Sequence, residues 1–200
     1  MLTRAQPTLI GSTDKEGDFL VPFSIAKGIN TTLSDLLTAS AFTCPAYLES
    51  LFRAKSDVPV WRYRYMPRFP TVTPYKWMRG ATHASDLLIV FGTTELLGSP
   101  TPAERAAEKY LQKIWVEFAK DPANGLAKLG WPKYSPKPKG MATSDVDGRA
   151  VLTVALEKTL VEIFPRNKIE VQFVDPQQYD KVCDNIQPIP WEEFAKGPPQ

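Results

Sequence analysis

The order of apolar and polar residues predicts one long amphipathic helix over residues 102–120. Apolar side chains recur there in steps of three and one, which places them on one helical face. Thr101 supplies an N-cap, Pro102 a first-turn proline and Glu104 the acid of a capping box. The Asp121–Pro122 pair ends the segment, because the residue before a proline disfavours helical geometry. We interpret this helix as structural packing.

Shorter patterns predict strands and brief helices on either side. Residues 58–65 (VPVWRYRY) are β-branched and aromatic, which is typical of a strand with Trp61, Tyr63 and Tyr65 on one face. We also expect a strand at 8–10 that runs into a turn at 11–17, and a short helix through Leu37 capped by Ser34. Pro45 interrupts this pattern and begins a second helix, which carries the apolar stripe Leu48, Leu51 and Phe52. The remaining expected elements are a short helix at 87–91 that ends at Gly92, a proline-rich loop at 130–140, an apolar run of ambiguous period at 151–164, and a strand at 169–174.

Composition bounds the kind of protein. The chain has 200 residues and 43% hydrophobic residues, enough for one domain with a real core, and its 19 prolines argue against a helix bundle. The net charge of +2 is too small to indicate a nucleic-acid partner or an anionic membrane surface. No apolar run approaches the roughly 20 residues that a membrane span requires. The first twelve residues show no signal peptide.

The potential metal ligands are few. The chain has one histidine, two cysteines and no C-x-x-C motif, so we expect no zinc site, and no feature indicates a cofactor. Cys44 and Cys183 are far apart in sequence, which fits one long-range disulfide or two free thiols equally.

His83 carries any imidazole chemistry, because it is the sole histidine. Small neighbours, Ala81 and Ala84, leave room for a substrate; the alternative is a surface or structurally satisfied histidine. Glu16 lies in the glycine-bounded turn after the first expected strand, where Asp14 is an equally plausible acid. An acid and then a histidine, each on a loop after a strand, follow the chain order of an α/β-hydrolase triad.

Five segments, in the right order over about residues 7–135, resemble type-B carboxylesterases of the cholinesterase-like family. These are the acid turn at 11–17 (GSTDKEG), the FTCP segment at 42–45, the histidine segment at 80–92 (GATHASDLLIVFG), WVEFAK at 115–120 and GWPKY at 130–134. The chain departs from the family pattern at Lys15, where aspartate is common, at Ala84, where glycine is usual, and at Asp86, where glutamate is usual.

The resemblance implies an α/β class: the C-terminal portion of an α/β-hydrolase fold, with the last sheet strands and their packing helices, incomplete. Residues 1–185 would form this partial domain and 186–200 a loosely held tail. The implied reaction is ester hydrolysis through an acyl-enzyme, with His83 as general base and then acid and Glu16 orienting its ring. Asp86 would support the local loop rather than catalyse.

The nucleophile of the implied triad is missing from the sequence. None of the ten serines stands in a G-x-S-x-G frame, and no glycine-rich oxyanion loop is present. We therefore expect this chain to be inactive alone and to meet an ester substrate only when the N-terminal part of the fold is supplied. A truncated or split gene product is the favoured explanation, and a non-catalytic cholinesterase-like binding protein is the alternative. A fragment of a parallel sheet would expose an apolar edge, which predicts self-association.

The resemblance also implies a disulfide between Cys44 and Cys183, since cholinesterases join the F-x-C-P cysteine to one near the C-terminus; two free thiols remain the alternative. Asn30-Thr31-Thr32 is a glycosylation sequon. Together these features favour secretion of the full-length relative.

Overall fold

The computed structural model describes residues 6–136, 141–146, 149–154, 158–165, 170–186, 192 and 196–197. The strands are β1 (Thr8–Thr13), β2 (Phe23–Ser24), β3 (Gly28–Ile29), β4 (Val60–Tyr65), β5 (Met141–Val146), β6 (Arg149–Val154), β7 (Leu160–Ile163) and β8 (Val171–Val174). The α-helices are α1 (Thr31–Leu37), α2 (Cys44–Lys55), α3 (Leu87–Phe91), α4 (Pro102–Lys120), α5 (Gly125–Lys128) and α6 (Gln177–Asp180). Shorter helical segments are η1 (Glu16–Phe19), η2 (Thr38–Thr43), η3 (Thr94–Leu96) and η5 (Lys181–Asn185).

A four-stranded sheet in the order β1-β4-β7-β8 forms the centre of the fold. β1 pairs with β4 and β4 with β7 in parallel, whereas β8 runs antiparallel to β7. Two small antiparallel pairs, β2-β3 and β5-β6, complete the described strands. The register places Thr13 opposite Tyr65, so β1 and β4 end side by side. The structure confirms the predicted α/β class with a mostly parallel sheet, as in part of an α/β-hydrolase.

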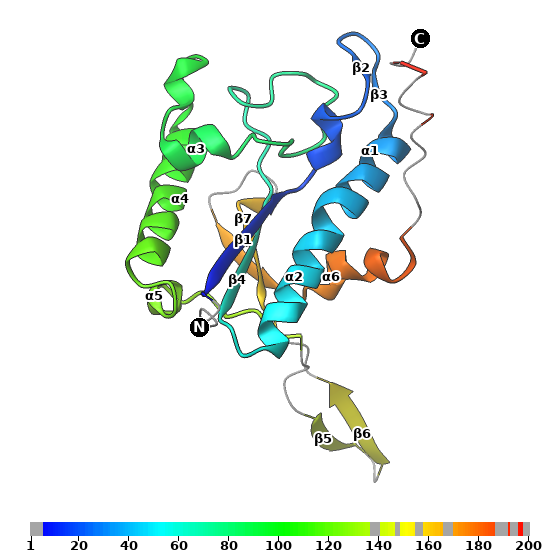
Figure 1. Ribbon diagram of the computed structural model, residues 1–200, viewed down its shortest axis with the longest axis vertical. Coiled ribbons are helices and arrows are strands. Elements are labelled where there is room, and N and C mark those ends of the chain that lie inside the picture. The colour runs from blue at the N-terminus through cyan, green and yellow to red at the C-terminus, as the bar shows by residue number, and fades with distance from the viewer. Residues whose placement is uncertain are drawn as a thin grey trace, which may run out of the picture.

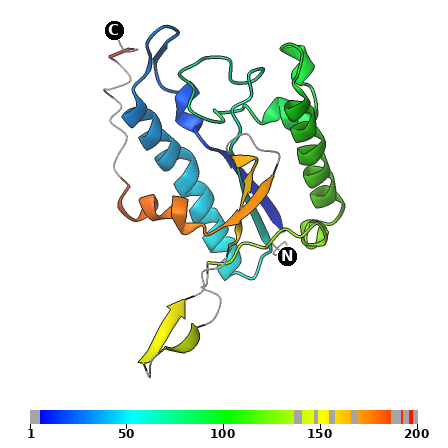
Figure 2. The ribbon, with the colours of Figure 1, turned by 180° about the vertical axis from the view of Figure 1, so that it is seen from behind.

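Helices cover both faces of this sheet (Figures 1 and 2). α3 and α4 lie on one side, and α1, α2 and α6 lie on the other. The aromatic face of β4 packs into the main core, where Trp61 and Tyr65 are fully buried beside Leu111 and Ile114 of α4. The predicted aromatic face of the strand at 58–65 and the predicted helix at 102–120 are therefore the two halves of one core.

The opposite face of β4 carries two buried arginines. Arg62 donates two hydrogen bonds to Asp180 of α6, from Nη1 to Oδ2 at 2.6 Å and from Nη2 to Oδ1 at 2.7 Å. Arg64 binds the side chain of Asp14 at 3.1 Å and lies over the ring of Tyr179, 4.3 Å from its centroid. Strand geometry explains the alternation, since successive side chains point to opposite faces. Burial raises the pKa of the Asp180 carboxyl, and Arg62 opposes this effect.

The Arg62–Asp180 pair gives a stability prediction. Replacing Arg62 by Met leaves Asp180 buried without its bidentate partner, which typically costs about 3–5 kcal/mol. We expect urea unfolding of R62M to shift accordingly. As a control, K128M removes the exposed Lys128–Asp121 pair and should leave the unfolding midpoint unchanged. Equal midpoints for R62M and the wild-type chain would contradict this prediction.

Several helix boundaries were predicted from the sequence and one cap was wrong. α4 begins and ends as predicted, with both hydrogen bonds of the Thr101–Glu104 capping box, and α3 ends at Gly92, whose φ of 65° is left-handed. Asn30, not Ser34, caps α1: its side chain accepts a hydrogen bond from the backbone N–H of Leu33, while Ser34 is buried inside the helix.

A second helix begins at Pro45 within one residue, as predicted, but the interruption expected before it is wrong. Pro45 lies in the first turn of α2, where its missing N–H costs nothing, and the π-helical η2 joins α1 to α2 without a break. The stripe of α2 does not form core, because Leu48 and Phe52 are 59% and 70% exposed. The 151–164 run divides between β6 and β7, and β8 accounts for the strand predicted at 169–174. Most of the predicted tail at 186–200 lies outside the described residues.

Candidate active site

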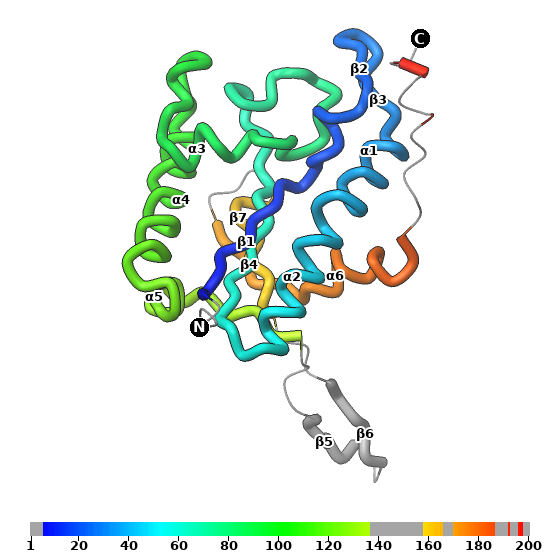
Figure 3. Tube along the Cα trace, in the orientation of Figure 1, coloured from blue at the N-terminus to red at the C-terminus, as the bar shows by residue number. Residues whose placement is uncertain are grey.

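The loops that follow β1 and β4 meet at one end of the sheet. The chain leaves β1 into η1, and it leaves β4 into a long loop that returns beside η1 (Figure 3). The backbone N–H of Lys15 donates to the carbonyl of Ala81 at 2.7 Å, and Lys15 and Thr82 form a parallel bridge. Parallel pairing of β1 with β4 therefore brings two segments together that are nearly seventy residues apart in sequence.

Glu16 and His83 form a direct contact at this junction. Nδ1 of His83 lies 2.7 Å from Oε2 of Glu16, and Oε1 of Glu16 accepts a 2.7 Å hydrogen bond from the backbone N–H of Thr13. Glu16 is 4% exposed, whereas 42% of the His83 side chain is exposed. A carboxylate can only accept, so the contact favours the tautomer with its proton on Nδ1 and leaves Nε2 as the basic nitrogen.

The structure separates Glu16 from the other acid considered, Asp14. The Asp14 side chain binds Nε of Arg64, and its carbonyl accepts from Nη2 of the same arginine at 2.7 Å. Asp14 is thus bound to Arg64, and of the two acids only Glu16 contacts His83. The acid segment starts at Gly11, where the ring of Tyr63 leaves no room for a side chain: a Cβ on Gly11 would lie 2.1 Å from a ring atom of Tyr63.

Asp86 stands close to the pair but does not replace Glu16. Burial raises the pKa of its carboxyl, and the negative charge of Glu16 raises it further, while its own backbone and His83 act in the opposite direction. Its carbonyl accepts the backbone N–H of Val90 at 2.8 Å, in the first turn of α3. The loop-supporting role predicted for Asp86 stays a prediction.

The loop around His83 shows where this chain departs from the family pattern. Ala84 has a φ of +62°, the left-handed region that glycine adopts without cost and that disfavours a Cβ by about 1–2 kcal/mol. Sequence reasoning missed Phe42, whose ring packs on the imidazole of His83 with centroids 5.1 Å apart. The FTCP segment was a signal for Phe42, since the resemblance placed it in a family motif without giving it a contact.

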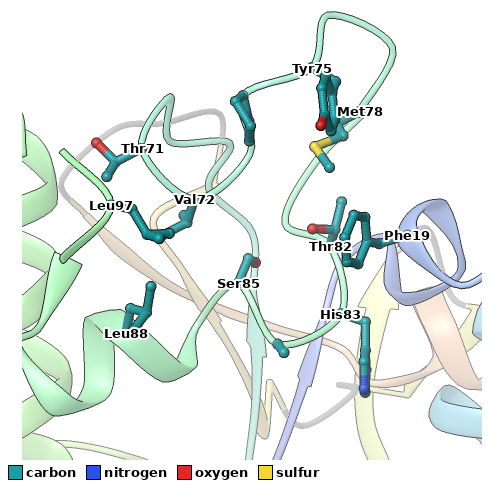
Figure 4. A pocket seen from close by; sticks show the side chains of 12 residues that line it. Phe19, Thr71, Val72, Tyr75, Met78, Thr82, His83, Ser85, Leu88 and Leu97 are labelled. Atoms are coloured by element: carbon teal, nitrogen blue, oxygen red, sulfur yellow. The ribbon is translucent and has the colours of Figure 1, made fainter. Parts of the chain in front are cut away.

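A pocket lies beside the histidine loop (Figure 4). Its volume is about 340 Å³, and apolar side chains dominate its wall, among them Phe19, Met78 and Leu88. Ser85 lines it with a buried hydroxyl that has no hydrogen-bond partner among the described residues. The visible ring nitrogen of His83 points away from the other lining side chains. The pocket therefore borders the histidine from one side, while Glu16 holds it from another.

Cys44 and Cys183 are joined by a disulfide, with an S–S distance of 2.00 Å and Cα atoms 5.4 Å apart. The bond connects the start of α2 to η5, so it fixes the C-terminal described segment to the helices beside the site. In the part of the chain that the structure describes, no cluster of three or more His, Cys, Asp or Glu side chains could hold a metal ion. No described helix has the length and apolar character to cross a membrane.

An acid and a histidine on loops after neighbouring parallel strands define a site of the α/β-hydrolase class. The chain belongs to the carboxylesterase family, whose model matches residues 24–160.

Curated relatives agree with this assignment. The chain is similar to secreted lipase 5 of Gibberella zeae, with 30% identity over 187 residues, which is 90% of this chain and 31% of that protein. It is also similar to chlorogenic acid esterase of Aspergillus niger, with 33% identity over 46% of this chain and 18% of the relative. Carboxylesterase 1F of Mus musculus is 29% identical over 58% of this chain and 20% of the relative. The chain spans about a third or less of the length of these relatives.

Proposed function

We propose that this chain supplies the acid and the base of a Ser-Glu-His carboxylic ester hydrolase, with Glu16 as the orienting acid and His83 as the base. The 2.7 Å contact between Oε2 of Glu16 and Nδ1 of His83 carries the proposal. Burial of Glu16 and the hydrogen bond from Thr13 hold the carboxylate in one position, as an orienting acid requires. No hydrogen bond joins Asp86 to His83 among the described residues, whereas Glu16 binds Nδ1 directly.

The two side chains would act in sequence during acyl transfer. Nε2 of His83 takes the proton of a serine hydroxyl as that oxygen attacks the ester carbonyl, and the imidazolium then gives the proton to the leaving alcohol. Glu16 stabilises the imidazolium through Nδ1–H. Water, deprotonated by His83, then attacks the acyl-enzyme, and the carboxylic acid product and the free serine are released. The 200 residues contain no G-x-S-x-G serine, so the nucleophile must be supplied from outside these residues and the chain alone is inactive.

The pocket beside His83 bears on the kind of ester. Its wall is mostly apolar and includes Phe19, Val72 and Met78, so it suits an apolar group on one side of the scissile bond. The non-catalytic alternative, a cholinesterase-like binding protein, would use the same pocket and would not need the Glu16–His83 contact. Absence of that contact in solution would therefore remove the reason to prefer the hydrolase.

Nuclear magnetic resonance of the histidine tests the contact directly. The chain has one histidine, so ¹⁵N labelling gives a single pair of imidazole signals. In the neutral imidazole we expect the proton on Nδ1, with a downfield Nδ1–H resonance protected from exchange. E16Q should lose that resonance and mix the tautomers, because an amide can orient the ring wrongly. As a control, E49Q changes an exposed glutamate that pairs with Arg53 and should leave the spectrum unchanged.

A wild-type imidazole with its proton on Nε2, or spectra of E16Q and wild type that coincide, would contradict the assignment of Glu16. The result does not depend on a supplied serine, since the contact lies wholly within this chain.

Self-association through a sheet edge remains a prediction. β1 and β8 form the two edges of the sheet, and an edge strand has unpaired backbone groups that can pair with another strand. We expect analytical ultracentrifugation to show dimers or larger species that grow with concentration. A monodisperse monomer with one cooperative thermal transition would count against it.

A further inference from the structure

A second link joins the acid turn to the histidine loop, independent of the Glu16–His83 contact. Asp18 lies two residues after Glu16, in η1, and Arg79 lies four residues before His83. The two form an ion pair with Nη2 of Arg79 2.6 Å from Oδ1 of Asp18. We call Asp18, Arg79 and Ser34, which binds the same carboxylate, the Asp18 clamp.

The Asp18 carboxylate is fully buried and every contact to it is a donor. Oδ1 accepts from Oγ of Ser34 at 2.7 Å, and from Nε and Nη2 of Arg79 at 3.1 and 2.6 Å. Oδ2 accepts from Nε of Arg79 at 3.3 Å and from its backbone N–H at 2.9 Å. The backbone contact matters most for position, because it fixes the main chain of the loop and not only the end of a flexible side chain.

The other side of the clamp is rigid. η1 lies directly on α1: a Cβ on Gly17 would stand 2.1 Å from the carbonyl oxygen of Ser34, and the Gly17 N–H donates to Oγ1 of Thr38 at 2.9 Å. Ser34 lies inside α1 and is fully buried. Asp18 therefore belongs to the packed helical layer, whereas Arg79 belongs to a loop without regular helix or strand.

Neighbouring carboxylates favour the charged form of Arg79. Burial works against the Arg79 guanidinium, but hydrogen bonds to Asp18 and Asp35 outweigh it and raise its pKa. Partial burial likewise works against the Asp35 carboxylate, but Arg79 and Lys15 lower its pKa below the ordinary value. Asp35 is about half exposed; it binds the guanidinium of Arg79 at 2.9 and 3.0 Å and Nζ of Lys15 at 3.4 Å, with no contact to the backbone of Arg79. Of these two aspartates, only Asp18 combines full burial with a hydrogen bond from the loop backbone.

We infer that Asp18 and Arg79 are positioning residues for His83: they hold its loop against the acid turn so that Nδ1 meets Glu16. The inference rests on the proposed function, because it assigns the clamp a purpose at that site. Neither residue touches the reacting atoms. Along the histidine loop, Ala81 accepts from the backbone N–H of Lys15 and lies between Arg79 and His83, so the clamp holds the start of this loop.

The test follows the Nδ1–H resonance of the sole histidine in the 200-residue chain, together with thermal unfolding of each variant. D18N removes the charge and should speed exchange of the Nδ1 proton at least about tenfold, the effect of one lost hydrogen bond. R79K keeps the charge without the bidentate fork and should give an intermediate rate. D35N weakens the exposed contacts of Asp35 to Arg79 and Lys15 and serves as the matched control, with wild-type exchange expected.

D18N leaves the Arg79 guanidinium without its charged partner and can prevent folding. The neutral double variant D18N/R79Q removes both charges and covers that case. Wild-type Nδ1–H exchange and tautomer in a folded D18N or D18N/R79Q chain would overturn the clamp. Failure of the proposed function looks different: the resonance would then be absent from the wild-type chain itself, or insensitive to E16Q.

Discussion

The 200-residue chain, purified alone, is expected to hydrolyse nitrophenyl esters no faster than its H83A variant. Losing the nucleophile of a Ser-His-acid triad typically costs about a million-fold in turnover, and the remaining acid and base cannot form an acyl-enzyme. The chain keeps the acid–base contact of Glu16 and His83 but has no glycine-framed serine. A spectrophotometric assay with nitrophenyl acetate and butyrate measures the difference between the two chains. Turnover that disappears in H83A would contradict the prediction.

A chimera supplies the positive control. This chain aligns with 187 residues of the Gibberella zeae lipase, so it can replace that segment in the relative. We expect the chimera to hydrolyse nitrophenyl esters, with a loss of about a million-fold on H83A and of roughly ten thousand-fold on E16A, in the ratio known for such triads. D121N, at an exposed carboxylate near the end of α4, should leave turnover unchanged. A chimera that stays active without His83 would refute the role of base.

Removal of the disulfide is expected to have the largest effect on stability. The bond between Cys44 and Cys183 closes a loop with a sequence separation of 139 residues. In the chain-entropy model, a loop of that length stabilises the folded state by about 5 kcal/mol, because the cross-link lowers the conformational entropy of the unfolded chain. We expect C44A/C183A to unfold at a much lower urea concentration than the wild-type chain.

Two controls separate cross-linking from packing. Reduction of the wild-type chain should reproduce the shift seen in C44A/C183A, whereas the double variant should not respond to reductant. Cys44 is buried, so a single C44S variant also reports the cost of a polar group at that site. Equal urea midpoints for oxidised wild type and C44A/C183A would refute the entropic contribution.

The local structure of the site was accessible from sequence because short-range rules decide it. The acid turn follows β1 as expected, α3 ends at Gly92, and α4 has its capping box from Thr101 to Glu104. Each of these depends on residues within a few positions of one another, so periodicity, caps and turn residues are enough. The cap of α1 was misplaced because Asn30 and Ser34 are both good caps by type.

Long-range partners were not accessible in this way. Arg62 and Arg64 alternate with aromatic residues in β4, which marks a strand, but nothing nearby names Asp180 as a partner 118 residues away. The exposed stripe on α2 shows the same limit, since Leu48 and Phe52 have the spacing of a core face and lie in solvent. Helical periodicity tells which side chains share a face, and packing decides whether that face is covered.

The sequence by itself determined the long helix at 102–120, the aromatic strand at 58–65, the sole histidine, the lack of a glycine-framed serine and the family motifs, because these are properties of residue type and spacing. The family motif implied Glu16 as the acid, and tertiary structure shows why Asp14 does not take its place, since Arg64 of the neighbouring strand binds Asp14. It also decided that Phe42 packs on the imidazole and that Asp18 holds the histidine loop through Arg79. The reason is physical: parallel pairing of β1 with β4 sets which loops meet, and burial then favours partners for the charged groups there.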